Sequence, residues 1–493
     1  MIAAMSSGSG KTILTAALAA FYKNQKKRVS VLKCGPDYLD PIFHNRVLSE
    51  EEKGGKNIDL FLQGRKKAVR IFKDLTEGAD IALVEGVMGF YDGISGTSEN
   101  SAWDIAEILG LPVILAVKPS GVSVTLAAAI KGLMTFRQSS HIIGIILTDC
   151  KSSTYAYLKP ILESETGLTV FGYLPHFEAA EIPSRHLGLA AVASGEILEI
   201  QEKFSTIAEK LPDTIDLNRI YEAAEEPGGQ TATDSFFSEQ SRVKIAVAYD
   251  DAFCFYYRTS LEALRAAGAE LCFFSPLSDS RLPEDISGLY LGGGYPELFL
   301  RELRDNRSIR DSILEVLSDG IPFIAECGGF MYLHKSISPV KTVDGEDGKV
   351  EAGEGHRYEM VGYLDGDCYN TGKLNRFGYL KFKNDGADEK KSTLFNSDEF
   401  IPAHEFHYYE STSPGADLLA VKERLGRSGT SSALAATDAV SDQGNRTYRM
   451  EWRFGYTGDG YYAGFPHIDL GGEIPVAEKF VEAALLYRDR NLS

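Results

Sequence analysis

Long apolar runs are absent from this sequence. None of its 493 residues belongs to a stretch approaching the roughly 18 to 20 consecutive apolar residues of a membrane span, so we expect no membrane segment. The N-terminus runs directly into Gly and Ser, without the charged and then apolar pattern of a secretion signal. Both absences predict a cytoplasmic protein.

Basic charge and closely paired cysteines are also scarce. The formal net charge is −19 and the one short basic patch is Lys23–Arg28, so we expect no nucleic-acid partner. The six cysteines lack Cys-x-x-Cys spacing, which argues against a zinc site and a disulfide framework but is compatible with one reactive thiol. They are Cys34, Cys150, Cys254, Cys272, Cys327 and Cys368.

The chain is longer than the size at which one hydrophobic core stops growing, so we expect two domains. A polar, turn-rich and non-periodic segment at 222–242 predicts a linker between domains 1–221 and 243–493. Short apolar runs alternate with helix-like segments in both halves, which predicts two α/β domains, the first with a mostly parallel sheet covered on both faces. The Gly-, Ser- and Ala-rich stretch 426–444 predicts a surface loop.

Individual elements can be placed from the periodicity of apolar residues. In the first half the predicted strands are Val29–Leu32, Ile81–Val84, Val113–Val117 and Ile142–Leu147, and the predicted helices are Thr12–Tyr22 and Val122–Thr135. In the second half we predict a helix at Ser260–Ala267 and strands at Lys244–Tyr249, Leu271–Phe274, Gly288–Leu291 and Pro322–Ala325.

A glycine-rich loop opens the first domain. It consists of Ser7, Gly8, Ser9, Gly10, Lys11 and Thr12. An Ala- and Leu-rich helix follows, an arrangement that points backbone N–H groups at phosphates, with Lys11 neutralising the β- and γ-phosphates of ATP and Thr12 holding Mg²⁺. The strict pattern asks for Gly where this chain has Met5, so the loop is a variant. A glycine-rich helix cap with an incidental lysine is the alternative.

Acidic residues follow two of the predicted strands. Asp37 and Asp40 come after the first strand and Glu85 after the second, at the carboxyl edge where ligand sites of α/β sheets lie. A carboxylate beside a phosphate loop suits Mg²⁺, because hard cations prefer oxygen ligands, and Glu85 is the first choice. In the alternative interpretation Asp37 and Asp40 only form turns, since Gly-Pro-Asp is common turn chemistry.

A cysteine between an apolar strand and a helix start marks the second domain. Cys327 is followed by two glycines, the strand-turn-helix pattern in which a turn exposes a nucleophile and the helix N-terminus favours a thiolate. The backbone N–H groups of Gly293 and Gly294, after another strand, could form an oxyanion hole. A buried structural cysteine is the alternative.

A thiol nucleophile also needs a base. His467 is the best candidate, and Asp469 would share its face in an extended segment and could orient the imidazole. His404 and His407 are separated by three positions instead of the four that the zinc helix motif requires, so we interpret them as site-lining or structural.

These segments together resemble the cobyrinic acid a,c-diamide synthase family over nearly the whole chain. Besides the glycine-rich loop, the matching segments are Lys33–His44, Glu85–Gly93, Leu174–Pro175, Ile182–Gly188, Ala252–Tyr257, Ser275–Leu277, Gly292–Glu297 and Glu326–Gly329. The resemblance implies a dethiobiotin-synthetase-like first domain and a class I glutamine amidotransferase-like second domain. It also implies ATP-dependent amidation of the a- and c-side-chain carboxylates of a corrin precursor of vitamin B12, with L-glutamine or ammonia as nitrogen source.

Roles for single residues follow from the same resemblance. The corrinoid and metal region would be lined by Asp37, Tyr38, Leu39 and Asp40. The metal ligands would be Thr12, Asp37 and Glu85. Asp92 would serve the order or coupling of the two amidations. Two positions depart from the family pattern: Thr148 replaces an Asn associated with the nucleotide base, and Asp469 replaces the His of many members or the Glu of distant class I amidotransferases.

Several alternatives stay open. The substrate could instead be hydrogenobyrinic acid or nickel sirohydrochlorin, and cobyric acid synthase is a further relative, although Gly35–Pro41 favours a,c-diamidation. A partitioning or scaffolding ATPase shares this kind of loop, but such proteins carry a second lysine where this chain has Ser6. The acidic charge and the thiol domain also argue against that class. The oligomeric state, with a homodimer among the candidates, is not determined by the sequence.

Overall fold

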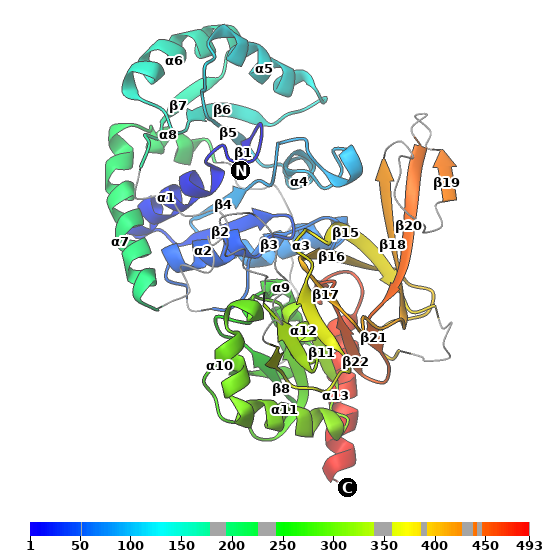
Figure 1. Ribbon diagram of the computed structural model, residues 1–493. Helices are drawn as coiled ribbons and strands as arrows, with labels where there is room; N and C mark the ends of the chain where they lie inside the picture. Colours follow the sequence, from blue (N-terminus) through cyan, green and yellow to red (C-terminus); the bar gives the residue numbers. More distant parts are fainter. Residues whose placement is uncertain are drawn as a thin grey trace, which may run out of the picture. The chain divides into compact units, whose positions relative to one another are not determined.

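The computed structural model describes residues 1–50, 52–177, 194–224, 243–339, 357–385, 392–425, 437–440 and 446–492. The chain divides into two compact units, Met1–Asp234 and Ser235–Ser493 (Figure 1). Most of the predicted linker 222–242, together with the segment Ile182–Gly188, lies outside the described residues, so the exact domain limits stay a prediction.

The first unit contains a seven-stranded sheet in the order β3-β2-β4-β1-β5-β6-β7, and its neighbouring strands pair in parallel. The strands are β1 (Ile2–Ala4), β2 (Val29–Cys34), β3 (Asn57–Ile58), β4 (Ile81–Glu85), β5 (Val113–Val117), β6 (Ile142–Leu147) and β7 (Thr169–Tyr173). All five residues of β5 are buried, as expected for a strand covered on both faces. The predicted parallel sheet is thereby confirmed.

Helices cover both faces of this sheet and form two separate apolar clusters. One cluster contains α1 (Lys11–Asn24), α2 (Leu39–Val47), α7 (Ser194–Lys210) and α8 (Leu217–Glu222). The other contains α3 (Arg65–Thr76), α4 (Ala102–Leu109), α5 (Val124–Thr135) and α6 (Ser152–Thr166). The predicted helices correspond to α1 and α5 and differ from them by no more than two residues at either end.

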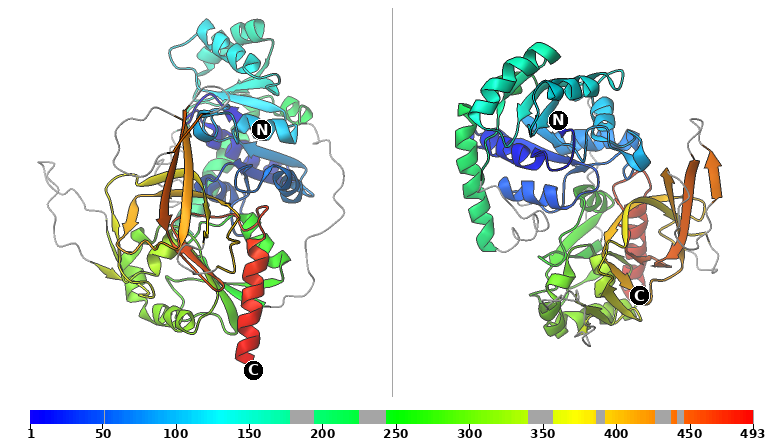
Figure 2. Two further views of the ribbon diagram at one scale, coloured as in Figure 1. Left: turned by 90° about the vertical axis from the view of Figure 1, so that its right-hand side faces the viewer. Right: turned by 45° about the horizontal axis from the view of Figure 1, so that its top comes forward.

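The second unit is built on a six-stranded sheet in the order β21-β22-β11-β10-β8-β9, parallel except at β21. Its strands are β8 (Val243–Ala248), β9 (Ala269–Phe274), β10 (Ile286–Leu291), β11 (Phe323–Glu326), β21 (Tyr456–Thr457) and β22 (Tyr461–Gly464). Its helices are α9 (Arg258–Ala266), α10 (Leu300–Asp305), α11 (Arg307–Ser318), α12 (Gly328–Tyr332) and α13 (Val476–Leu492). The red C-terminal helix α13 packs on β8 and β10 (Figure 2).

Two further sheets of the second unit were not predicted from the sequence. A four-stranded sheet contains β12 (Ser336–Ser338), β13 (Tyr358–Glu359), β14 (Asp367–Asn370) and β17 (Tyr409–Ser411). A five-stranded antiparallel sheet contains β15 (Arg376–Lys383), β16 (Ile401–His407), β18 (Leu418–Leu425), β19 (Thr437–Val440) and β20 (Arg446–Phe454). The prediction of a loop at 426–444 is wrong over β19, because backbone pairing with β20 makes those residues a strand. The remaining residues of that stretch lie outside the described part.

Candidate active sites

The glycine-rich loop connects β1 to α1. Gly8 and Gly10 have left-handed backbone conformations, with φ of 75° and 81°, that favour glycine. Lys11 is buried, and its Nζ donates hydrogen bonds to the carbonyl oxygens of Met88 at 2.8 Å and Ser6 at 3.2 Å. Burial lowers the pKa of Lys11 to about 8. An anion at the N-terminus of α1 would supply the negative charge that these carbonyl partners lack.

A buried ionic network adjoins this loop at the ends of β2 and β4. Glu85 Oε1 accepts hydrogen bonds from Thr12 Oγ1 at 2.6 Å and Lys33 Nζ at 2.9 Å. Glu85 Oε2 lies 2.6 Å from Nε2 of the buried His44. Burial opposes ionisation of Glu85, but the charge of Lys33 and the hydrogen bond from His44 hold its pKa below the ordinary value. Glu85 is therefore an ionised carboxylate in contact with the hydroxyl that we expect to hold Mg²⁺.

Asp40, in the first turn of α2, joins the same network. Its Oδ2 lies 2.5 Å from Lys33 Nζ, and its Oδ1 lies 3.5 Å from Thr12 Oγ1. Burial, followed by the charge of Glu85, raises the pKa of Asp40 to about 7. Two carboxylates and one hydroxyl thus converge at the start of α1.

These oxygen atoms fit a magnesium ion. Mg²⁺ is usually held by one or two carboxylates together with substrate phosphates and water, instead of a dedicated protein cage. Thr12, Asp40 and Glu85 provide such a set beside the phosphate loop. Within the described residues, no group of three or more His, Cys, Asp or Glu side chains forms a ready-made metal cage.

The remaining residues predicted to contact substrate lie where β2 leads into α2 and in the segment that follows β4. Asp37 Oδ1 accepts the backbone N–H of Leu39 at 2.8 Å, which is the turn interaction considered as the alternative. Tyr38 is buried where α2 begins. Asp92 Oδ2 accepts the N–H of Gly89 at 3.0 Å. Their contacts with substrate, and a metal-ligand role for Asp37, stay predictions.

A cavity of about 170 Å³ lies beside the glycine-rich loop. It is lined by Gly8, Ser9, Gly10, Ile13, Lys118, Thr148, Asp149, Leu174, Pro175, His176 and Phe177. Thr148 Oγ1 donates to the carbonyl oxygen of Ser9 at 2.7 Å, so this departure from the family pattern supports the loop backbone. Lys118 and Asp149, which form an ion pair at 2.6 Å, were not predicted. Lys118 directly follows the predicted strand that ends at Val117, and Asp149 comes two residues after the one that ends at Leu147, so their position at strand ends was the available signal.

In the second unit Cys327 lies at the sharp turn between β11 and α12, with φ 47° and ψ −101°. A Cβ atom on Gly329 would lie 2.1 Å from the carbonyl oxygen of Leu291, so only glycine allows this turn to approach β10 so closely. Burial, together with the charge of Glu297, raises the pKa of the Cys327 thiol above its ordinary value. The thiol is therefore protonated in the free protein and needs a base before it can attack.

The predicted oxyanion turn lies against the predicted base. A Cβ atom on Gly293 would lie 2.3 Å from His467 Cε1 and 3.1 Å from His467 Nε2, so the imidazole packs directly on that glycine. A Cβ atom on Gly328, the residue after Cys327, would lie 3.1 Å from the backbone nitrogen of Gly294. The structure thus brings the thiol, the imidazole and the glycine turn to one edge of the sheet.

The two carboxylates near His467 have different partners. His467 Nδ1 lies 3.6 Å from Glu326 Oε2, on the residue before the thiol. Asp469 instead accepts hydrogen bonds from Thr259 Oγ1 at 2.7 Å, Ser260 Oγ at 3.2 Å and the N–H of Gly471 at 2.9 Å. The predicted pairing of Asp469 with His467 stays a prediction, and Glu326 is a nearby carboxylate that sequence reasoning did not single out.

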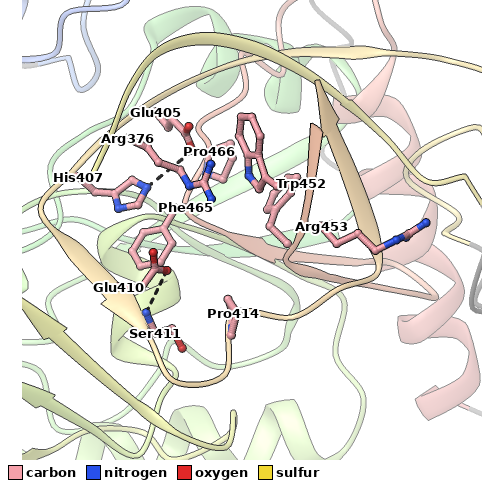
Figure 3. A pocket seen from close by; sticks show the side chains of 11 residues that line it. Arg376, Glu405, His407, Glu410, Ser411, Pro414, Trp452, Arg453, Phe465 and Pro466 are labelled. Carbon is pink, nitrogen blue, oxygen red and sulfur yellow. Dashed lines mark hydrogen bonds and ion pairs between the residues drawn. The ribbon is translucent and has the colours of Figure 1, made fainter. Parts of the chain in front are cut away.

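The other two histidines occupy different places. His404 pairs through its backbone with His467, and its N–H donates to the His467 carbonyl oxygen at 3.0 Å. His407 lines a cavity of about 250 Å³ in which its ring stacks on Phe465 at 4.1 Å (Figure 3). Its Nε2 faces Glu405 Oε2 at 3.7 Å, beyond hydrogen-bond distance. Neither histidine belongs to a metal cluster among the described residues.

Comparisons with known proteins agree with two units of different kinds. Residues 1–189 match the CobQ/CobB/MinD/ParA nucleotide binding domain, and residues 244–446 match the CobB/CobQ-like glutamine amidotransferase domain. Cys327 lies inside the second match, whereas His467 lies beyond its end. No helix in the described ranges is both long enough and apolar enough to cross a bilayer.

Curated relatives cover most of the chain. The chain is 38% identical over 409 residues to "Cobyrinate a,c-diamide synthase" of Caldanaerobacter subterraneus subsp. tengcongensis. The aligned region covers 83% of this chain and 85% of the relative. The protein of that name from Clostridium tetani is 38% identical over 413 residues, covering 83% and 86%. The one from Priestia megaterium is 35% identical over 486 residues, covering 98% and 96%.

Proposed function

The chain belongs to the cobyrinate a,c-diamide synthase family, and from that premise we propose that it amidates the a- and c-side-chain carboxylates of cobyrinic acid, using ATP and glutamine. The observation that carries this proposal is the similarity to relatives of that name over 98% of the chain. A phosphate loop in one unit and a Cys-His pair in the other support it, because the reaction needs both an activated carboxylate and a source of ammonia.

The first unit would activate the carboxylate. A carboxylate does not react with ammonia at neutral pH, so it first takes the γ-phosphoryl group of ATP and becomes an acyl phosphate, releasing ADP. Ammonia then displaces phosphate and leaves the amide. Lys11 and the N–H groups at the start of α1 would bind the phosphates and stabilise charge on the transferring group.

Thr12, Glu85 and Asp40 would hold Mg²⁺, which neutralises phosphate charge when it is bound. Lys33 and His44 fix the carboxylate of Glu85 by direct contacts of 2.9 Å and 2.6 Å. Such outer contacts orient a metal ligand and keep it ionised. The cavity lined by Lys118 and Asp149 would receive the nucleotide base.

The second unit would release ammonia from glutamine. His467 takes the thiol proton of Cys327, and the sulfur attacks the side-chain amide carbon, with Gly293 and Gly294 donating to the developing oxyanion. The proton passes from the imidazole to the leaving ammonia, and water hydrolyses the thioester to glutamate and restores the thiol.

Two substitutions test this division of labour. Cys327→Ser should abolish glutamine-dependent amidation while preserving amidation with ammonium salts, because the synthetase unit is intact. Lys11→Ala should abolish both, because each nitrogen source needs the acyl phosphate. ADP release and product mass are the readouts. Equal loss with both nitrogen sources in Cys327→Ser would remove the assigned role of the thiol.

Three tetrapyrroles are candidates for the natural substrate. Hydrogenobyrinic acid and nickel sirohydrochlorin carry carboxylates of the same kind, so the activation chemistry serves each of them. Parallel depletion assays with the three tetrapyrroles would rank them by kcat/KM. We propose cobyrinic acid as the substrate because the relatives are named cobyrinate a,c-diamide synthase. Cytoplasmic location and a homodimeric assembly stay predictions.

A further inference from the structure

The third member of a cysteine-histidine triad fixes the imidazole so that Nε2 faces the thiol. In this chain the sequence suggested Asp469, two residues after His467. We propose that Glu326, the residue immediately before the nucleophile, is the positioning residue for His467. This inference rests on the glutaminase half of the proposed function and adds a residue to it.

The fold places Glu326 next to the imidazole. β11 and β22 are parallel neighbours, and Glu326 pairs with Gly464 at their carboxyl ends. His467 follows three residues beyond Gly464, so the strand end that carries the nucleophile also faces the loop that carries the base. Glu326 Oε2 lies 3.6 Å from His467 Nδ1, the nitrogen that an orienting carboxylate must face. This separation is longer than a hydrogen bond, and such contacts often tighten when substrate binds.

Glu326 is itself held rigidly in an enclosed environment. It is 1% exposed, its Oε1 accepts the N–H of Ile468 at 3.0 Å, and its Oε2 accepts the hydroxyl of Tyr290 at 3.1 Å. Burial raises the pKa of Tyr290, so that hydroxyl stays protonated and remains a donor. The bond to Ile468 ties the carboxylate to the residue next to His467, so the two side chains keep their relative position.

The neighbouring groups make Asp469 the weaker candidate. Its carboxylate accepts hydrogen bonds from Thr259, Ser260 and Gly471, which directs both oxygens toward α9 and its own turn. Burial lowers the pKa of His404, whose backbone pairs with that of His467, to about 3, so the His404 ring is neutral at physiological pH. Glu326 Oε2, at 3.6 Å, is a carboxylate oxygen that the structure places facing His467 Nδ1.

The test uses glutamate release from glutamine, which does not depend on which tetrapyrrole is the substrate. Glu326→Gln keeps the side-chain shape but removes the charge and presents an amide to Nδ1. We expect kcat to fall by on the order of 10²-fold, with KM for glutamine changed little, because the base His467 is no longer held in place whereas glutamine binding is unaffected.

Two further variants separate positioning from structural damage. Asp469→Asn should cause a smaller loss of kcat than Glu326→Gln. Glu326→Asp keeps a carboxylate but withdraws it by about one bond, so kcat should fall by an intermediate factor. Amidation with ammonium salts should survive in all three.

The proposal is overturned if Glu326→Gln keeps kcat within a few-fold of the wild type, or if Asp469→Asn lowers kcat more than Glu326→Gln does. If Glu326→Gln fails to fold, Glu326→Asp serves as the test instead, and an unchanged kcat in Glu326→Asp would overturn the proposal. A wild-type protein that releases no glutamate would contradict the glutaminase assignment itself, so the two failures are distinguishable.

Discussion

Gly293 offers a sharp test of the glutaminase geometry, because its missing side chain is where the imidazole lies. In Gly293→Ala the new Cβ atom would lie 2.3 Å from His467 Cε1, whereas ordinary contact begins at 3.4 Å. The ring or the turn must therefore move by about 1 Å, and misplacement of a catalytic group by that amount costs on the order of 10²-fold in rate. Gly293 has no left-handed φ, so the alanine backbone itself is unstrained.

The assay compares glutamate release with ammonium-dependent amidation in the same variant. We expect glutamine-dependent kcat to fall by on the order of 10²-fold while the ammonium-dependent rate is retained, because the first unit is untouched. Gly288→Ala is the control on β10, because its new Cβ atom would meet Ile245 Cγ1 at 3.2 Å and Phe480 Cζ at 3.4 Å, neither of which belongs to a predicted catalytic residue. A Gly293→Ala protein that releases glutamate at a rate close to the wild type would refute the placement of His467.

Two other predictions concern the first unit. Because burial lowers the pKa of Lys11 to about 8 from the ordinary 10.5, the folded state binds fewer protons than the unfolded state between these values. The stability of nucleotide-free wild type relative to Lys11→Met should therefore rise with pH across that window in thermal unfolding, and a flat or falling difference would contradict the burial argument. Gly132→Ala, in the exposed interior of α5 with open space around the new Cβ atom, should raise the free energy of unfolding by about 0.5–1 kcal/mol. Gly110→Ala has equally open space but lies at φ +64° after α4, so it should lower the free energy of unfolding by about 1 kcal/mol. Urea titration measures both variants, and equal effects would show that backbone conformation does not determine the sign of the change.

Much of the sheet architecture could be predicted because parallel strands leave continuous apolar runs. Val113–Val117 and Ile142–Leu147 match β5 and β6 at both ends. The five-stranded sheet was missed, because β15 and β18 are interspersed with polar residues and obtain their order from long-range backbone pairing. A period of apolar residues cannot reveal which distant segments pair.

The sites show the same division between local and long-range information. Residues in contiguous motifs, such as Lys11, Thr12 and Cys327, could be named from spacing alone. His44 and Glu326 could not, because their importance comes from contacts of 2.6 Å with Glu85 and 3.6 Å with His467. Residues distant in the chain meet there, and only the fold determines which of several carboxylates faces a given imidazole.

The central claim is tested most directly by incubating the protein with cobyrinic acid, ATP, Mg²⁺ and glutamine, and following ADP and product mass together. The account predicts two successive conversions of a carboxylate to an amide, each accompanied by one ADP and one glutamate. ATP turnover without a change in tetrapyrrole mass, or no turnover with active glutaminase, would contradict it.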